Sequence, residues 1–219
     1  GGYLTRWRCW FKVLGFCVVH VVIRVKCSLK ALEAGVDASV AEGFEAGGLF
    51  GREETTTFTL IPMVKEKLNL PLIAAGGIAT GKGMLAAMVL GADGVQVGSR
   101  FVASEESSAH QAFKQVVVDA KEGDTQLTLK ELAPVRLIKN KFFNEVQELY
   151  KKGPTVEELK TLLGRARAKR GMFEGDLEDG ELEIGQIAGL IHEIKPVATI
   201  VKEMLAEFEE AKVQIKNFQ

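Results

Sequence analysis

The chain alternates short apolar runs with stretches in which apolar residues recur at every third or fourth position. The apolar runs cover residues 16–23, 38–41, 72–75 and 94–97. Their Val, Ile and Ala content predicts strands that are buried on both faces. The stretches between them, residues 26–34, 60–68 and 83–90, have helical spacing. This alternation is typical of parallel βαβ units, so we expect an α/β fold over this part of the chain.

After residue 101 the pattern predicts helices without strands. Residues 108–121 are amphipathic, and Thr155 with Glu158 forms a capping box for a helix that continues to about residue 169. A loop rich in glycine and acidic residues, 171–185, leads to a short helix and then to a helix over residues 196–212 with one apolar stripe. We expect these helices to pack as a cap on the α/β part.

Composition and charge narrow the class of protein. The chain has 219 residues, of which 47% are hydrophobic, and its 28 basic and 29 acidic residues give a net charge of −1. An ordinary apolar content excludes a disordered or collagen-like chain. The charge balance leaves no basic excess for phosphates, so neither nucleic acid nor a membrane surface is expected as a partner.

The three cysteines, Cys9, Cys17 and Cys27, lie close together near the start of the chain. An odd number without C-x-x-C spacing predicts neither a disulfide framework nor a metal site, so we expect a reduced, cytoplasmic setting. The apolar stretch 13–25 follows basic residues in the manner of a signal peptide. It is shorter than a bilayer span and no small-x-small cleavage site follows, so a strand is the better interpretation.

Two glycine-rich turns follow neighbouring predicted strands. Gly76 and Gly77 come after the run 72–75, and the next helix is expected to begin near Gly83; Gly98 and Ser99 come after the following run. Either turn alone is best explained as a tight connection. Together, about 22 residues apart, they predict a phosphate site, because backbone amides at the carboxyl ends of adjacent parallel strands converge on anions.

A third segment, residues 41–57, leaves the strand that precedes this pair. Its Gly47–Gly48 pair would allow a flat ring system to approach the backbone closely. Residues 53–57 are equally well explained as a solvated connection with a threonine-rich helix start.

Taken together, these three segments resemble the FMN-dependent nitronate monooxygenases. The resemblance starts near residue 20 and continues through the segments 91–101, 106–110, 134–136, 139–141 and 185–190. The flavin-dependent enoyl-acyl-carrier-protein reductases share the same type of barrel. Membership of this group implies a TIM-type (β/α)8 barrel that holds FMN at the carboxyl ends of its strands.

The resemblance also implies roles for individual residues. The FMN phosphate would be held by Ala75, Gly76, Gly77, Gly98 and Ser99. Gln96 would contact the side of the flavin, and Gly47 and Gly48 would line the isoalloxazine ring. The implied reaction is the oxidation of an alkyl nitronate by oxygen to a carbonyl compound and nitrite.

One departure from the family concerns catalysis. Leu49 stands where the family usually has a histidine directly after the Gly-Gly pair, and leucine cannot exchange a proton. His20, within a predicted buried strand, His110, and His192, on a predicted C-terminal helix, are better explained by packing or surface roles. No catalytic residue is therefore identified. We expect the oxidation of anionic nitronates to be retained and proton abstraction from neutral nitroalkanes to be much slower.

The second departure concerns extent. The resemblance supplies only strands five to eight of an eight-stranded barrel, which needs roughly 250 residues. We divide the chain into an atypical segment, 1–15, a partial FMN-binding barrel, 16–125, and a helical region, 126–219. A half-barrel exposes open edges, so we expect either a fragment, or a homo-oligomer or pairing with the missing half. The alternatives are an enoyl reductase and a catalytically silent flavin- or phosphate-binding remnant.

Overall fold

A computed structural model describes residues 10–11, 13–49 and 53–217 of the chain. These residues form two compact units, which are described separately. The first unit contains the described residues up to Phe44, the stretch 53–97 and the end of the chain from Met204. The second contains the described residues from Glu45 to Leu49 together with 98–203.

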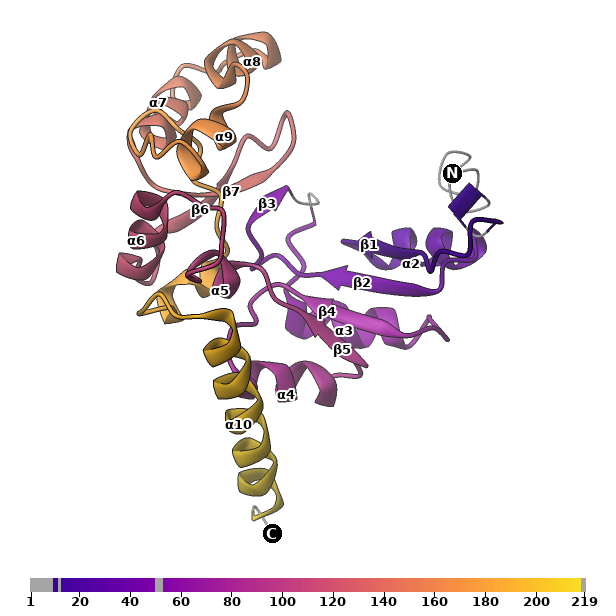
Figure 1. Ribbon diagram of the computed structural model, residues 1–219. Helices are drawn as coiled ribbons and strands as arrows, with labels where there is room; N and C mark the ends of the chain where they lie inside the picture. The colour runs from indigo at the N-terminus through magenta and orange to yellow at the C-terminus, as the bar shows by residue number, and fades with distance from the viewer. Residues whose placement is uncertain (1–9, 12, 50–52, 218–219) are drawn as a thin grey trace. The chain divides into compact units, whose positions relative to one another are not determined.

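The first unit is built on a parallel sheet whose strands lie in the order β1-β2-β4-β5 (Figure 1). Its strands are β1 (Val19–Val22), β2 (Ala38–Glu42), β4 (Leu72–Ala75) and β5 (Gly94–Gln96). The four predicted apolar runs are these four strands, and the β4 run has the predicted bounds. The expectation of a parallel α/β architecture is thereby confirmed.

Three helices connect these strands and pack against the sheet: α2 (Val25–Glu33), α3 (Thr57–Lys65) and α4 (Gly81–Val89). Their apolar positions and those of the strands form one core, which includes Leu60, Ile61 and Leu72, each at most 2% exposed. Burial of this apolar surface is the main stabilising contribution in the first unit.

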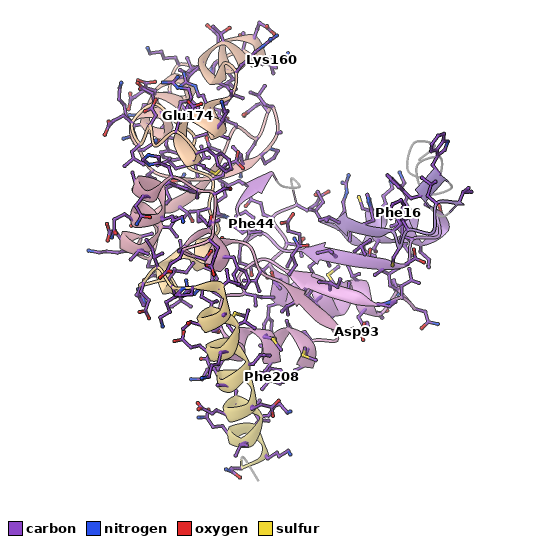
Figure 2. All side chains as sticks on the ribbon, viewed as in Figure 1. Phe16, Phe44, Asp93, Lys160, Glu174 and Phe208 are labelled. Carbon is purple, nitrogen blue, oxygen red and sulfur yellow. The ribbon has the colours of Figure 1, made fainter. Side chains whose placement is uncertain are left out.

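The strand β1 differs from the prediction of burial on both faces. Val19 and Val21 are 48% and 46% exposed, whereas Val22 is buried in the core. Within the described residues β1 pairs only with β2, so it forms an edge of the sheet. Phe16, which precedes it, is also exposed (Figure 2). The apolar run therefore predicted the strand correctly, but the strand is less buried than the run predicted.

Asp93 fixes the start of β5 relative to β4 (Figure 2). Its Oδ2 accepts a hydrogen bond of 2.9 Å from the backbone N–H of Leu72 and one of 2.7 Å from the ammonium of Lys65 on α3. The Lys65 hydrogen bond, followed by the one from Leu72, lowers the pKa of Asp93. This carboxylate connects the ends of two strands and a helix, and so sets the register that brings the strands' carboxyl ends level.

The second unit contains an antiparallel sheet in the order β3-β7-β6. Its strands are β3 (Gly48–Leu49), β7 (Val135–Ile138) and β6 (Thr125–Thr128). The prediction of helices alone after residue 101 was therefore wrong. The two missed strands are four residues each, and Arg136, which interrupts the apolar pattern of β7, is itself buried in the sheet.

The helices of the second unit are α5 (Ser99–Val102), α6 (Gln111–Asp119), α7 (Lys141–Tyr150), α8 (Val156–Leu163), α9 (Arg167–Met172) and the 3₁₀ helix η1 (Gln186–Leu190). The capping box of Thr155 and Glu158 is confirmed at the start of α8. The helix predicted to reach residue 169 instead ends at Gly164, whose φ of +64° is incompatible with helix continuation.

The last helix, α10 (Val197–Lys216), contributes its residues up to Glu203 to the second unit and the rest to the first. None of the helices within the described residues has the length and apolar character needed to cross a membrane.

Candidate functional site

The turn after β4 is the first predicted site element, and its backbone requires glycine. Gly76 and Gly77 have φ values of +93° and +69°, in the left-handed region that side chains disfavour. A Cβ on Gly76 would lie 2.8 Å from the carbonyl oxygen of Gly43. The Thr57 hydroxyl lies 2.9 Å from the carbonyl oxygen of Gly76, and the Gly43 N–H donates to that of Ala75. The turn is thus fixed from two sides.

The N-terminus of α4 differs from the prediction in its first residue, and two of its amides have acceptors within the chain. The helix begins at Gly81, not near Gly83, and the Gly83 N–H donates to the Thr80 hydroxyl at 3.0 Å. The Gly81 N–H donates to a carboxylate oxygen of Glu207 on α10 at 2.6 Å. Both of these amides therefore already have an acceptor within the first unit.

The turn itself retains donors. Among the described residues, no acceptor lies against the backbone N–H groups of Gly77 and Ile78. Such consecutive amides around left-handed glycines form a concave anion-binding backbone. This turn therefore stays the candidate for the predicted phosphate site.

The carboxyl ends of three strands meet beside this turn. Glu42 is paired with Ala75, and Ala75 is paired with Gln96 on β5. Glu42 is half-buried, and burial raises the pKa of its carboxyl group. We did not identify Glu42 as a site residue from the sequence, although a carboxylate that ends an apolar strand at this edge was a usable signal.

In the second unit, Gly47 and Gly48 lie against the segment before η1. A Cβ on Gly47 would lie 2.6 Å from the carbonyl carbon of Ile184, so only glycine permits this approach. Gly48 has a φ of +87° and pairs with Arg136 of β7.

Ser99, at the start of α5, is connected to the same segment. Its hydroxyl accepts a hydrogen bond of 3.0 Å from the Gly185 N–H. The Gln186 N–H donates to the carbonyl oxygen of Glu45 at 2.8 Å. The second unit therefore brings both Gly47 and Ser99, which are far apart in the sequence, close to Gly185. A Cβ on Gly98, by contrast, would meet no atom of the described residues within 4 Å.

Two carboxyl groups that the sequence did not single out lie at this place. Glu183 Oε2 is 3.2 Å from the position of a Cβ on Gly48, and burial raises the pKa of Glu183. Burial, assisted by repulsion from Glu183 and opposed by Arg167, raises the pKa of Glu181 to about 7. Both belong to the acidic loop that the sequence analysis treated as a connection. Carboxyl groups perturbed in this way are typical of functional sites.

The structure describes the backbone of Leu49, which pairs with Val135, but its side chain lies outside the described part. Of the histidines, His110 accepts a hydrogen bond from the Ala112 N–H at the start of α6. His20 is half-buried, not part of a fully buried strand, and His192 lies exposed between η1 and α10, not on a helix as predicted. None of these three has an interaction that identifies it as a base.

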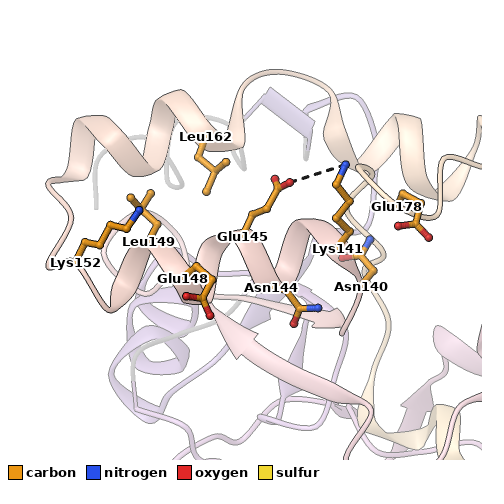
Figure 3. Close-up of a pocket in the computed structure, with 9 residues that line it drawn as sticks. All are labelled: Asn140, Lys141, Asn144, Glu145, Glu148, Leu149, Lys152, Leu162 and Glu178. Atoms are coloured by element: carbon orange, nitrogen blue, oxygen red, sulfur yellow. Dashed lines mark ion pairs between the residues drawn. The ribbon is translucent and has the colours of Figure 1, made fainter.

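A separate pocket lies along α7, beside α8 (Figure 3). It is lined by Asn140, Lys141, Asn144, Glu145, Glu148, Leu149, Lys152, Leu162 and Glu178. Lys141 and Glu145 form an ion pair across its wall, and the Asn140 side chain caps α7. The predicted site residues do not line this pocket, so it is not part of the candidate site.

Comparison with known proteins was made by sequence. The family model for nitronate monooxygenase matches residues 11–207. A probable nitronate monooxygenase of Staphylococcus saprophyticus is 35% identical over 177 residues, which is 76% of this chain and 50% of the relative. One of Bacillus subtilis is 32% identical over 213 residues, 93% of this chain and 60% of the relative. The chain thus spans about half to three fifths of the length of these relatives.

Solved structures give a similar result. FabK from Thermotoga maritima superimposes with a TM-score of 0.90 and 41% identity, over 98% of this chain and 68% of that one. The nitroalkane oxidase of Streptomyces ansochromogenes gives a TM-score of 0.79 and 27% identity, over 96% of this chain and 62% of that one. The fold of this chain is therefore also found in these proteins.

Proposed function

Because the chain belongs to the nitronate monooxygenase family, we propose that it carries the FMN-binding site of an oxidoreductase that oxidises alkyl nitronates with oxygen to carbonyl compounds and nitrite. The observation that carries this proposal is the left-handed turn of Gly76 and Gly77, with amides that have no acceptor in the described residues. A dianionic phosphate is the ligand that such a turn fits best.

The cofactor contacts follow the family resemblance. Within the first unit, the backbone at Ala75, Gly76 and Gly77 would hold the phosphate and Gln96 would contact the flavin. Within the second, Gly98 and Ser99 would contribute to phosphate binding, and Gly47 and Gly48 would line the ring. The open space at the Cβ position of Gly98 supports this, because no protein atom requires glycine there.

A bound flavin would supply the electron-transfer chemistry with oxygen, and the protein would bind and orient the substrate. A nitronate is already anionic, so its oxidation requires no proton abstraction by the chain. This matters here because Leu49 replaces the histidine that the family resemblance leads one to expect. The small-molecule partners are therefore the alkyl nitronate and oxygen.

We further propose that β1, β2, β4 and β5 are strands five to eight of a TIM-type barrel. The remaining strands would come from a segment outside this sequence or from another chain, including a second copy. The division at residues 15 and 125 and the cytoplasmic setting stay predictions of the sequence. The described cysteines, Cys17 and Cys27, are free, which is compatible with that setting.

Two other functions remain as alternatives. The 41% identity to FabK, against 27% to the nitroalkane oxidase, favours keeping the flavin-dependent enoyl reductase as the second candidate. The loss of the histidine at position 49 favours a catalytically silent flavin-binding remnant as the third.

Purification of the chain followed by titration with FMN tests the binding proposal through the flavin absorption bands. Oxygen uptake with propyl-2-nitronate is then compared with NADH-dependent reduction of an enoyl thioester. Nitronate-dependent uptake supports the proposed function, and NADH-dependent reduction supports the second candidate. FMN binding with neither reaction supports the remnant, and a chain that takes up no FMN contradicts both enzyme functions.

A further inference from the structure

We propose that Glu183 is the proton-transfer group of this site and acts on neutral nitroalkanes in place of the histidine missing at position 49. This inference rests on the proposed function, because it names the group that would convert a neutral substrate into the nitronate. It concerns only residues of the second unit.

The position of Glu183 is the main argument. Its Oε2 lies 3.2 Å from where a Cβ on Gly48 would be, and Gly48 is the residue directly before Leu49. A Cβ at position 48 would be in tight contact with this carboxylate, whereas glycine leaves room for the carboxylate beside the backbone. The carboxylate consequently lies close to the backbone that the resemblance places against the flavin ring.

The backbone on both sides of Glu183 is fixed. The Ile138 N–H donates to the carbonyl oxygen of Leu182 at 2.9 Å, and Glu183 itself forms a bridge with Leu137 of β7. Two residues further on, the Gly185 N–H donates a hydrogen bond to the Ser99 hydroxyl. The backbone that carries the carboxylate is thus held in place, which is one requirement for a proton-transfer residue.

The surroundings of Glu183 shift its pKa in the direction that makes the carboxylate a stronger base. Burial raises the pKa of Glu183, and the neighbouring Glu181 carboxyl has a pKa of about 7. Arg167 of α9 opposes the shift of the Glu181 pKa, and Arg136 lies in β7 next to Leu137, the residue that bridges Glu183. A base is most efficient when its pKa is close to the working pH.

The proposed step is a simple proton transfer. Ionised Glu183 takes the proton from the carbon next to the nitro group. The electron pair of that C–H bond forms the carbon–nitrogen double bond, and the negative charge moves to the nitro oxygens. The products are a nitronate and a neutral carboxyl group, which then releases its proton to water. No oxidation occurs in this step.

Exchange of the α-hydrogens of nitroethane in deuterated water, followed by proton NMR, measures this step without flavin turnover. We expect Glu183→Gln to lower protein-catalysed exchange by roughly 10²–10⁴-fold, the usual contribution of a general base. Glu183→Asp, which keeps the acid but shortens it, should retain part of the rate. Glu122→Gln, which changes an exposed carboxylate of the same unit, should have no effect.

Thermal unfolding and FMN titration establish that each variant is folded. If Glu183→Gln does not fold, the exchange rate of Glu183→Asp is compared with that of the parent chain instead. The inference is overturned if folded Glu183→Gln exchanges as fast as the parent chain, if the parent does not accelerate exchange, or if Glu42→Gln alone abolishes it. If the inference holds and only the proposed function fails, exchange depends on Glu183 but propyl-2-nitronate is not oxidised. If both hold, Glu183→Gln should lose oxidation of nitroethane and keep that of the preformed nitronate.

Discussion

The backbone N–H of Gly185 donates a hydrogen bond of 3.0 Å to the hydroxyl of Ser99, 86 residues earlier in the chain. A Cβ on Gly185 would approach the same oxygen to 2.8 Å, so glycine is needed for this geometry. The bond fixes the segment that carries Glu183 to the first residue of α5. One hydroxyl of a predicted site residue thereby holds a segment of the second unit that the sequence did not single out.

Replacing this hydroxyl should weaken both the fold and the site. In Ser99→Ala the Gly185 N–H loses its acceptor, and we expect the free energy of unfolding to fall by about 1 kcal/mol. FMN affinity should fall as well, because Ser99 is a proposed phosphate contact. Denaturant unfolding and flavin titration measure the two effects.

Ser107→Ala is the matched control. The Ser107 hydroxyl also accepts a backbone hydrogen bond, from Ala109, but within a local turn. It should lower stability by a similar amount and leave FMN affinity unchanged. Equal loss of affinity in both variants would show that Ser99 acts only through stability.

Gly98→Ala separates cofactor binding from folding. Because a Cβ there meets no protein atom within 4 Å and the φ of −106° is negative, we expect stability to change by less than about 0.5 kcal/mol. FMN affinity should fall at least tenfold, about 1.4 kcal/mol, if the phosphate approaches this backbone. Isothermal titration calorimetry measures the change.

Gly94→Ala provides the comparison, since its Cβ also meets open space. An unchanged FMN affinity in Gly98→Ala would place the phosphate elsewhere. Gly76→Ala is the poorer probe. Its φ of +93° and the nearby Gly43 carbonyl would destabilise the turn itself, so any loss of affinity would be ambiguous.

The elements that the sequence predicted well depend on local pattern. The strand Leu72–Ala75 has the predicted bounds because four apolar residues lie between a proline and a glycine pair. The capping box of Thr155 and Glu158 follows from two side chains three positions apart. In both cases the information lies within a few residues of the element.

The elements that were missed depend on partners far away in the sequence. The strand β7 pairs Val135 with Leu49, and its buried Arg136 hides it from an apolar-pattern criterion. Glu183 was missed for the same reason, because only the fold brings an acidic loop to Gly48. Gly47 and Gly76 were identified as places where backbone approaches closely, but the sequence did not say which residues approach them.

Glu207→Ala should destabilise the start of α4. The carboxylate accepts the Gly81 N–H at 2.6 Å and places a negative charge at a helix N-terminus. Loss of both effects should lower the free energy of unfolding by about 1 kcal/mol. The Gly81 amide should also exchange faster in hydrogen–deuterium exchange. Glu209→Ala, which removes an exposed ion pair with Lys212, should change stability by less than about 0.5 kcal/mol. Equal effects would contradict the capping role.

Leu49→His tests whether the missing imidazole limits the reaction. In the flavin-loaded protein it should raise turnover of neutral nitroalkanes more than turnover of nitronates, because only the former need a proton removed. Oxygen uptake with nitroethane and with its preformed nitronate gives the ratio. A uniform gain for both substrates would indicate an effect on binding instead.

The shifted carboxyl of Glu181 predicts a pH dependence of stability. Its pKa of about 7 in the folded protein exceeds the ordinary value of 4.5, so the folded state holds its proton over a range in which the unfolded state has lost it. The contribution of this group to the free energy of unfolding is fully present below about pH 4.5 and is lost as the pH rises to about 7. The loss amounts to at most about 3 kcal/mol. Glu181→Gln has no group to ionise and should remove that slope. Denaturant unfolding of both proteins between pH 4.5 and 8 measures it, and an identical slope in the two would mean that another group controls the decline.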